Sequence, residues 1–242
     1  MINKKIFTLL LISCLFSSAK VGTAVYRWAE IESGARAIGM AGSQVASGYG
    51  ISSLPYNPAS ISFIESNQIY AAKSSYLAGT SHNTLAFATA LTPSDFLGVH
   101  LFYFDSGNMM ETTELNPTGT GQNFKFTGLL LRLSYAKHLT DRLKLGGTFK
   151  YFNEQTTSAD LSMSSVAFDI GSSFDTGIYG MTLGMCISNL GPDARYMGTG
   201  LDLPDDQDIQ NKTDYFPVPL TFRVGLMNHI ISSDSSSPVV MD

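Results

Sequence analysis

"YGMTLGMCISNL", residues 179–190, alternates between two kinds of side chain over its whole length. The odd-numbered positions carry large, mostly apolar side chains and the even-numbered positions carry small ones. The odd set is Tyr179, Met181, Leu183, Met185 and Ile187, and the even set is Gly180, Thr182, Gly184, Cys186 and Ser188. A period of two over such a length indicates a β-strand with two chemically different faces. The stretch therefore predicts a sheet with one apolar face and one face of small residues.

The same alternation recurs along the chain, with a weaker example near its start. The further segments are 67–76, 85–91, 97–104, 129–136, 143–151, 166–171 and 220–226. Successive strands joined by turns favour antiparallel pairing. We therefore predict an all-β fold of about eight strands.

Three features favour an antiparallel up-and-down outer-membrane β-barrel over a soluble exported β-sandwich, which would also alternate. Strands of about ten residues match a tilted crossing of the hydrocarbon layer. Aromatic residues gather at the predicted strand ends 102–104, 150–154 and 214–217, as interfacial girdles require. Connections also differ in length: 92–95, 139–142 and 175–177 are short, 105–123 and 189–217 are long, and 153–160 is intermediate.

The N-terminus has the pattern of an export signal. Lys4 and Lys5 precede the apolar run 6–16, and small residues follow up to Ala24. This predicts a secretory signal peptide over residues 1–24. A lipidated Cys14 and a buried N-terminal helix are the alternatives, and loss of Cys14 with the signal would leave Cys186 without an intramolecular disulfide partner.

Composition agrees with a membrane location. Only 14% of the 242 residues are charged, against about 25% in ordinary soluble domains. The formal net charge of −5 makes nucleic acid a poor partner.

Residues 33–59, "SGARAIGMAGSQVASGYGISSLPYNPA", are too rich in glycine for a stable helix and alternate too little for a strand. A barrel lined with small residues leaves a lumen to fill. We therefore predict that 25–66 folds back as a hatch or plug, that 67–231 forms the barrel strands, and that 232–242 is a polar tail.

Two parts of this N-terminal region, 34–42 and 57–59, resemble the signature of the PorV/PorQ family in the FadL-like group of outer-membrane barrels. The stretches 133–152, 167–177, 187–198 and 217–226 agree with it in the same order. The resemblance implies a hatch motif, and its residues are Gly34, Arg36, Gly39, Gly42, Asn57, Pro58 and Ala59. We expect Arg36 to form a lumenal ion pair with Asp169 or another acid, with binding of a solute carboxylate as the alternative.

The resemblance also bears on completeness and on function. Family barrels have more strands than this chain supplies, so we expect an incomplete chain, with a self-sufficient small barrel as the alternative. Some members take part in type IX secretion and receive cargo proteins, whereas FadL-like relatives pass hydrophobic small molecules. We therefore expect a protein of the outer membrane of a Gram-negative-type bacterium that contacts its lipids. Its partners would be secreted cargo proteins or other secretion components. If the protein is instead a transporter, its ligand would be a hydrophobic small molecule.

Catalytic and cofactor chemistry is not indicated by any motif. The sequence contains no G-x-S-x-G, no H-E-x-x-H and no Walker motif. The four histidines (His82, His100, His138 and His229) have no metal-ligand spacing, and four aspartates (Asp202, Asp205, Asp206 and Asp208) are expected to form a solvated loop rather than a calcium site. We predict no enzyme, no cofactor and no metal. Transport predicts an apolar pocket of ligand size beside the hatch, whereas docking predicts a packed lumen and ordered outer loops.

Overall fold

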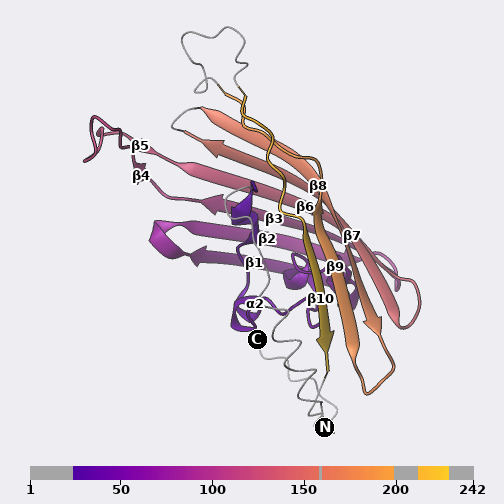
Figure 1. Cartoon of the computed structure of the whole chain (residues 1–242). Helices are drawn as coiled ribbons and strands as arrows, with labels where there is room; N and C mark the ends of the chain where they lie inside the picture. Colours follow the sequence, from indigo (N-terminus) through magenta and orange to yellow (C-terminus); the bar gives the residue numbers. More distant parts are fainter. Residues whose placement is uncertain (1–23, 158–159, 199–211, 229–242) are drawn as a thin grey trace, which may run out of the picture.

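The computed structural model describes residues 24–157, 160–198 and 212–228, and its main feature is one curved antiparallel sheet (Figure 1). Eight strands pair in the order β1-β2-β3-β6-β7-β8-β9-β10. Their bounds are β1 Asn67–Ser75, β2 Ser81–Ala90, β3 Asp95–Asp105, β6 Phe126–His138, β7 Leu143–Thr156, β8 Leu161–Asp175, β9 Thr182–Leu190 and β10 Thr221–Met227. The prediction of an all-β, up-and-down antiparallel fold with eight strands is confirmed. Within the described ranges the sheet is open, because β1 and β10 do not pair with each other.

Several predictions fall on residues outside the described ranges. They are the signal peptide up to residue 23, Cys14, the four aspartates between 202 and 208, His229 and the tail 232–242. None of the helices in the described part of the chain is long and apolar enough to cross a lipid bilayer.

The predicted strands are correct in position but not always in extent. The alternating stretch 179–190 begins as a turn, because Tyr179 has φ 50° and β9 starts only at Thr182. The segment 153–160 is not an intermediate loop: β7 continues to Thr156 and β8 begins at Leu161. At that end of the sheet only the connections 106–125 and 191–220 are long, so the predicted sorting of loops by length rests on these two.

One face of the sheet is apolar, and none of the residues that the structure describes covers it. Its exposed side chains are Leu85, Phe87, Leu97, Val99, Leu101, Leu133, Tyr135, Leu145, Phe149, Tyr151, Phe168, Ile170, Phe174, Met185, Ile187, Phe222, Val224 and Leu226. Exposure is greatest on the two edge strands, where Ile69 of β1 is 77% exposed and Leu226 of β10 is 68% exposed. We call this surface the outer face.

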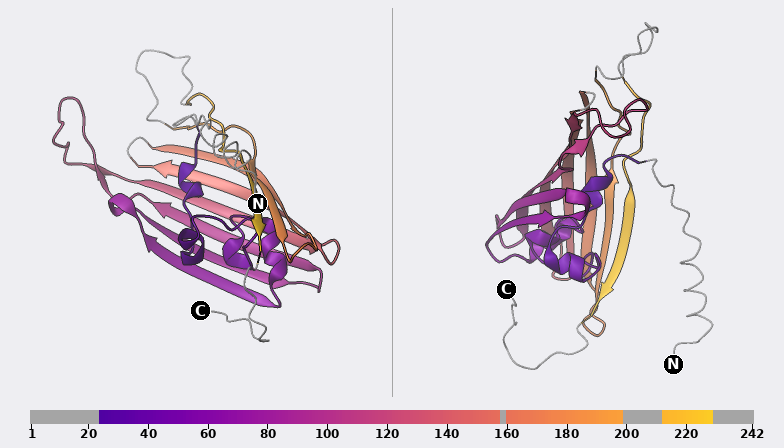
Figure 2. Two further views of the ribbon diagram at one scale, coloured as in Figure 1. Left: turned by 60° about the horizontal axis from the view of Figure 1, so that its bottom comes forward. Right: turned by 90° about the vertical axis from the view of Figure 1, so that its left-hand side faces the viewer.

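The opposite, inner face is covered by the N-terminal segment, residues 24–66. This segment contains four short helices, η2 Arg27–Glu30, α2 Ala35–Gly39, η3 Ile51–Ser53 and η4 Pro58–Phe63. Figure 2 shows the sheet curving around them. The core of the protein therefore lies between this segment and the inner face, in two clusters that share no residue.

One prediction about the aromatic residues is wrong. Phe102, Phe104 and Phe152 were expected in interfacial girdles, but they are buried on the inner face. They pack against the N-terminal segment, with the Phe102 ring 6.1 Å from Trp28 and the Phe152 ring 4.8 Å from Tyr26. Their even numbers already placed them on the face of the small residues, so alternation is the stronger guide here than clustering.

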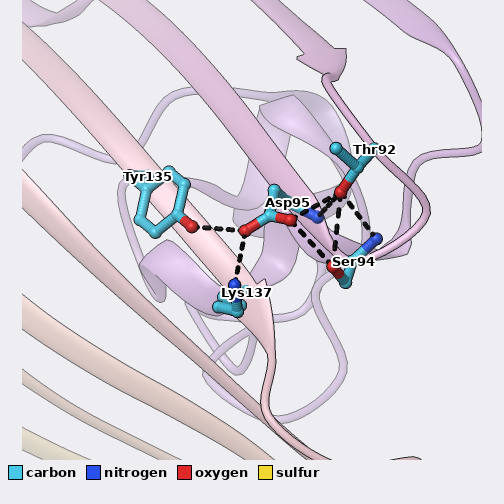
Figure 3. A network of polar contacts seen from close by, with 5 residues as sticks. All are labelled: Thr92, Ser94, Asp95, Tyr135 and Lys137. Atoms are coloured by element: carbon cyan, nitrogen blue, oxygen red, sulfur yellow. Dashed lines mark hydrogen bonds and ion pairs between the residues drawn. The ribbon is translucent and has the colours of Figure 1, made fainter.

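The tight connection between β2 and β3 is tied to a third strand (Figure 3). Asp95 accepts hydrogen bonds from the Thr92 hydroxyl at 2.5 Å and from the Ser94 hydroxyl at 2.8 Å. On β6, the Tyr135 hydroxyl donates to Asp95, and Lys137 Nζ lies 2.9 Å from the same carboxylate. The turn thereby fixes the register of β3 against β6 at this end of the sheet.

Candidate functional site

The inner face divides into three bands that run across the strands, and together with the N-terminal segment they form the candidate site. The strand register places small residues in a band near the tight turns, where Ala136, Gly146, Gly171 and Cys186 succeed one another from β6 to β9. A charged band follows in the middle of the strands, and an aromatic band lies toward the long connections. The N-terminal segment crosses all three.

In the first band, Asn57 fastens the N-terminal segment to the sheet. Its side-chain oxygen accepts from the Ala59 backbone N–H at 3.0 Å, which caps η4. Its amide nitrogen donates to the Val45 carbonyl at 2.7 Å and to the Ser172 carbonyl of β8 at 2.9 Å. The bonds to Val45 and Ala59 are buried and the bond to Ser172 is partly buried, and Pro58 fixes the backbone at the first turn of η4.

Glycines of the inner face allow this close approach. A Cβ atom at Gly146 would lie 2.5 Å from the Pro58 carbonyl carbon and 2.6 Å from the Ala59 nitrogen. A Cβ at Gly171 would meet the Asn57 side chain, and one at Gly184 would meet the Val45 backbone. The small residues of the inner face are therefore matched to the N-terminal segment as a contact surface.

The charged band contains a buried ion pair. Lys150 Nζ on β7 lies 2.7 Å from the Asp169 carboxylate on β8 and donates to the Asn189 side chain at 2.8 Å. Asp169 also accepts from the Asn189 backbone N–H at 2.8 Å, and Asn189 donates to the Pro219 carbonyl just before β10. This network joins β7, β8 and β9 from within and ties them to the residue Pro219 just before β10.

Arg132 on β6 lies beside this pair without a carboxylate of its own. Its Nη1 donates to Nδ1 of His100 at 3.0 Å. A guanidinium can only donate, so Nδ1 of His100 accepts and the proton of its neutral ring is on Nε2. Nε2 of His100, Nε of Arg132 and the hydroxyl of Tyr56 are buried without a hydrogen-bond partner. Burial raises the pKa of Tyr56, so this hydroxyl remains a donor.

The aromatic band encloses a second carboxylate. Trp28 Nε1 donates to Glu154 at 2.7 Å, and the Tyr196 hydroxyl donates to the same carboxylate. A hollow of about 440 Å³ adjoins them. Aromatic side chains from the N-terminal segment, β6 and the β9–β10 connection line it, namely Tyr26, Trp28, Phe126, Tyr196 and Phe216.

The residues of the predicted hatch motif do not form one site. Asn57, Pro58 and Ala59 are buried against the sheet, whereas Arg36 and Gly39 are exposed. Gly34 and Gly42 hold positive φ angles of 104° and 75° around α2, which explains the glycines there.

The expected ion pair between Arg36 and Asp169 is wrong. Arg36 donates to the Ser47 carbonyl at 3.1 Å, and Asp169 pairs with Lys150. Arg36 is exposed on α2 and bonds within the N-terminal segment, so it supports that segment and not the charged band.

The charged band and Trp28 were not identified from sequence. A signal for the band was present, because His100, Arg132, Lys150 and Asp169 all occupy positions of the small-residue face. Ionisable side chains on that face predict either a wet lumen or a paired cluster, and the structure shows a buried cluster.

No protein-family model matches the sequence, and no curated protein matches it at a significant level.

Proposed function

We propose that this chain forms part of the wall of an outer-membrane β-barrel of the PorV/PorQ type, with the N-terminal segment as its plug, and that it supports protein secretion or the docking of proteins at the cell surface. The observation that carries this is the outer face, which is apolar across the long strands and is left open by the part of the chain that the structure describes. The inner face, by contrast, is covered although it carries the ionisable residues.

This arrangement is the reverse of a soluble sandwich. In a sandwich, the apolar faces of two sheets pack on each other and the polar faces meet water. Here the apolar face of the sheet is the free one, and a soluble monomer rarely exposes an apolar surface of such extent. Lipid is the environment in which the outer face is stable.

A membrane position also demands that the two free edges be paired. Unpaired N–H and C=O groups in hydrocarbon cost several kcal/mol each. We therefore propose that further strands close the barrel between β10 and β1.

The close contact between the N-terminal segment and the inner face supports the plug. Backbone atoms of residues 45, 58 and 59 approach the sheet so closely that several glycines admit no Cβ. A tightly seated plug suits a barrel whose loops dock proteins more than one whose lumen conducts.

A FadL-like transporter of hydrophobic small molecules is the second candidate. The hollow beside Trp28 favours it, because about 440 Å³ lies in the range of ligand pockets and its lining is largely aromatic. Its carboxylate, Glu154, is already engaged by Trp28 and Tyr196, so an apolar ligand fits it better than an anionic one.

Three experiments separate these possibilities. First, expressed protein should fractionate with the outer membrane; recovery as a soluble monomer without detergent would favour the exported sandwich. Second, deletion of residues 33–59 should leave the protein inserted and should raise solute leakage from liposomes; unchanged leakage would contradict the plug.

Third, Trp28 is the one tryptophan of the chain, so its fluorescence reports on the hollow alone. Docking predicts no saturable quenching by a brominated alkane. Saturable quenching would favour transport, and the variant Phe216→Ala, which alters the lining without touching Trp28 or Glu154 hydrogen bonds, should then weaken it.

A further inference from the structure

A second, much smaller hollow lies in the charged band between the N-terminal segment and the sheet. Its volume is about 30 Å³, enough for roughly one or two water-sized particles. Tyr56 lines it from the N-terminal segment, and Arg132, Lys150 and Arg223 line it from β6, β7 and β10. It is separate from the aromatic hollow beside Trp28, with which it shares no lining residue.

The cationic side chains at this hollow outnumber the anions available to them. Lys150 is paired with Asp169 at 2.7 Å. Arg132 is only 4% exposed, and among the residues that the structure describes no carboxylate lies within ion-pair distance of it. A buried charge without a counterion is strongly unfavourable.

Two acids, Glu30 and Glu32, also line the hollow, and neither forms an ion pair with Arg132. Glu30 pairs with Arg27 at 2.8 Å. The Glu32 carboxylate lies against Gly42, on the side of α2.

Hydrogen-bond donors at the hollow lack acceptors as well. Nε of Arg132 and the hydroxyl of Tyr56 are both buried and without a partner. Buried polar groups in native proteins nearly always have one. A bound water would supply an acceptor but would leave the positive charge of Arg132 uncompensated.

We propose that this hollow is a binding site for one small monovalent anion, of the size of chloride or of a single carboxylate group. The anion accepts from Arg132 Nε and from the Tyr56 hydroxyl, and Arg223 adds to the positive potential. Because Tyr56 belongs to the N-terminal segment and Arg132 to β6, the anion clamps that segment to the sheet. The inference does not depend on the membrane function proposed above.

The test compares salts at equal ionic strength on the purified full chain in detergent. Sodium gluconate serves as the reference, because gluconate is too large for the hollow, and sodium chloride and sodium formate are the probes. Chloride should raise the midpoint of thermal unfolding by about 2–4 °C over gluconate, since an anion that binds only the folded state stabilises it. A rise with formate but not with chloride would assign the site to a carboxylate group, and equal midpoints in all three salts would overturn the proposal.

Matched variants localise the effect. Tyr56→Phe removes one hydroxyl and should abolish the chloride response, whereas Tyr49→Phe, at an exposed tyrosine of the same segment, should retain it. Arg132→Gln should also lose the chloride response. In gluconate this variant should be more stable than the unchanged protein, because it no longer buries the charge of Arg132. If Arg132→Gln does not fold, Tyr56→Phe decides, and an undiminished chloride response in Tyr56→Phe would refute the site.

Crystals soaked in bromide give a direct readout. An anomalous peak between Tyr56 and Arg132 is expected. Bromide bound only at the protein surface would contradict the proposal.

Discussion

Replacement of Gly146 by alanine tests whether the N-terminal segment is held by close backbone contact with the sheet. Gly146 and Gly147 are neighbours on β7, but Gly146 faces the segment and Gly147 faces outward. A Cβ at Gly146 would lie 2.6 Å from the Ala59 nitrogen, whereas at Gly147 the nearest atom would be 3.8 Å away. Gly147→Ala is therefore the matched control.

The expected difference between the two variants follows from the contacts. Both lose the flexibility of glycine in a strand, which stabilises each by about 0.5–1 kcal/mol. Only Gly146→Ala forces a methyl group into backbone atoms, and such overpacking costs about 1–3 kcal/mol. The seating of the segment should thus be weaker in Gly146→Ala than in Gly147→Ala by about 1–3 kcal/mol.

Hydrogen exchange measured by mass spectrometry can report this difference locally. The amides of Gly50 and Ser60 are hydrogen-bonded within the segment, at 2.9 Å to the Ser60 carbonyl and 3.0 Å to the Asn57 carbonyl. If opening of the segment governs their exchange, they should exchange about 5- to 150-fold faster in Gly146→Ala than in Gly147→Ala. Equal exchange in the two variants would refute the close-contact reasoning.

Three further predictions concern the charged band, the hatch motif and the orientation of the strands. Lys150→Met should lower the free energy of unfolding, measured with denaturant, by about 3–5 kcal/mol, because Asp169 then remains buried without its partner. The double variant Lys150→Met/Asp169→Leu should recover much of this loss. Lys137→Met, at the exposed pair with Asp95, should have little effect. Asn57→Ala removes a cap and two further hydrogen bonds and should lower the free energy of unfolding by about 1–3 kcal/mol. Gly39→Ala should be close to neutral, since no atom lies within 4 Å of its added Cβ. Similar denaturant midpoints for the two variants would argue against Asn57 as the residue that fastens the N-terminal segment. A probe attached at Thr118 should be labelled from outside intact cells, and one at Asp141 only after the outer membrane is opened; labelling at both sites would contradict a membrane-spanning topology, and a reversed pattern would invert it.

Period-two alternation was enough to predict the sheet and the identity of its faces. Leu183 and Met185 lie on one face of the sheet and Gly184 and Cys186 on the other. Consecutive side chains of a strand point to opposite faces, whatever the rest of the fold does. Strand ends were less predictable. Tyr179 continues the alternation, yet a positive φ at this residue puts it in the turn.

The candidate site was predictable only in part. The pairing of Asn57 with the Ser172 carbonyl joins residues 115 positions apart, and no local pattern encodes it. Arg36 was expected to pair with Asp169 or another acid, but it donates to the Ser47 carbonyl. The actual partner, Lys150, stands on the strand next to Asp169, and cross-strand register decides such a pair.

The separation in sequence between the N-terminal segment and the strands it contacts has a consequence for how the chain is made. Trp28 meets Glu154 across 126 residues, and Asn57 meets β8 across 115. The segment is synthesised first, but the surface that receives it does not exist until β7 and β8 have paired, and contacts so distant in sequence form late. We therefore expect the glycine-rich segment to settle on the sheet only after β7 and β8 have paired. Before that contact forms, the strands would be paired and the outer face complete, while the inner face would lack its cover.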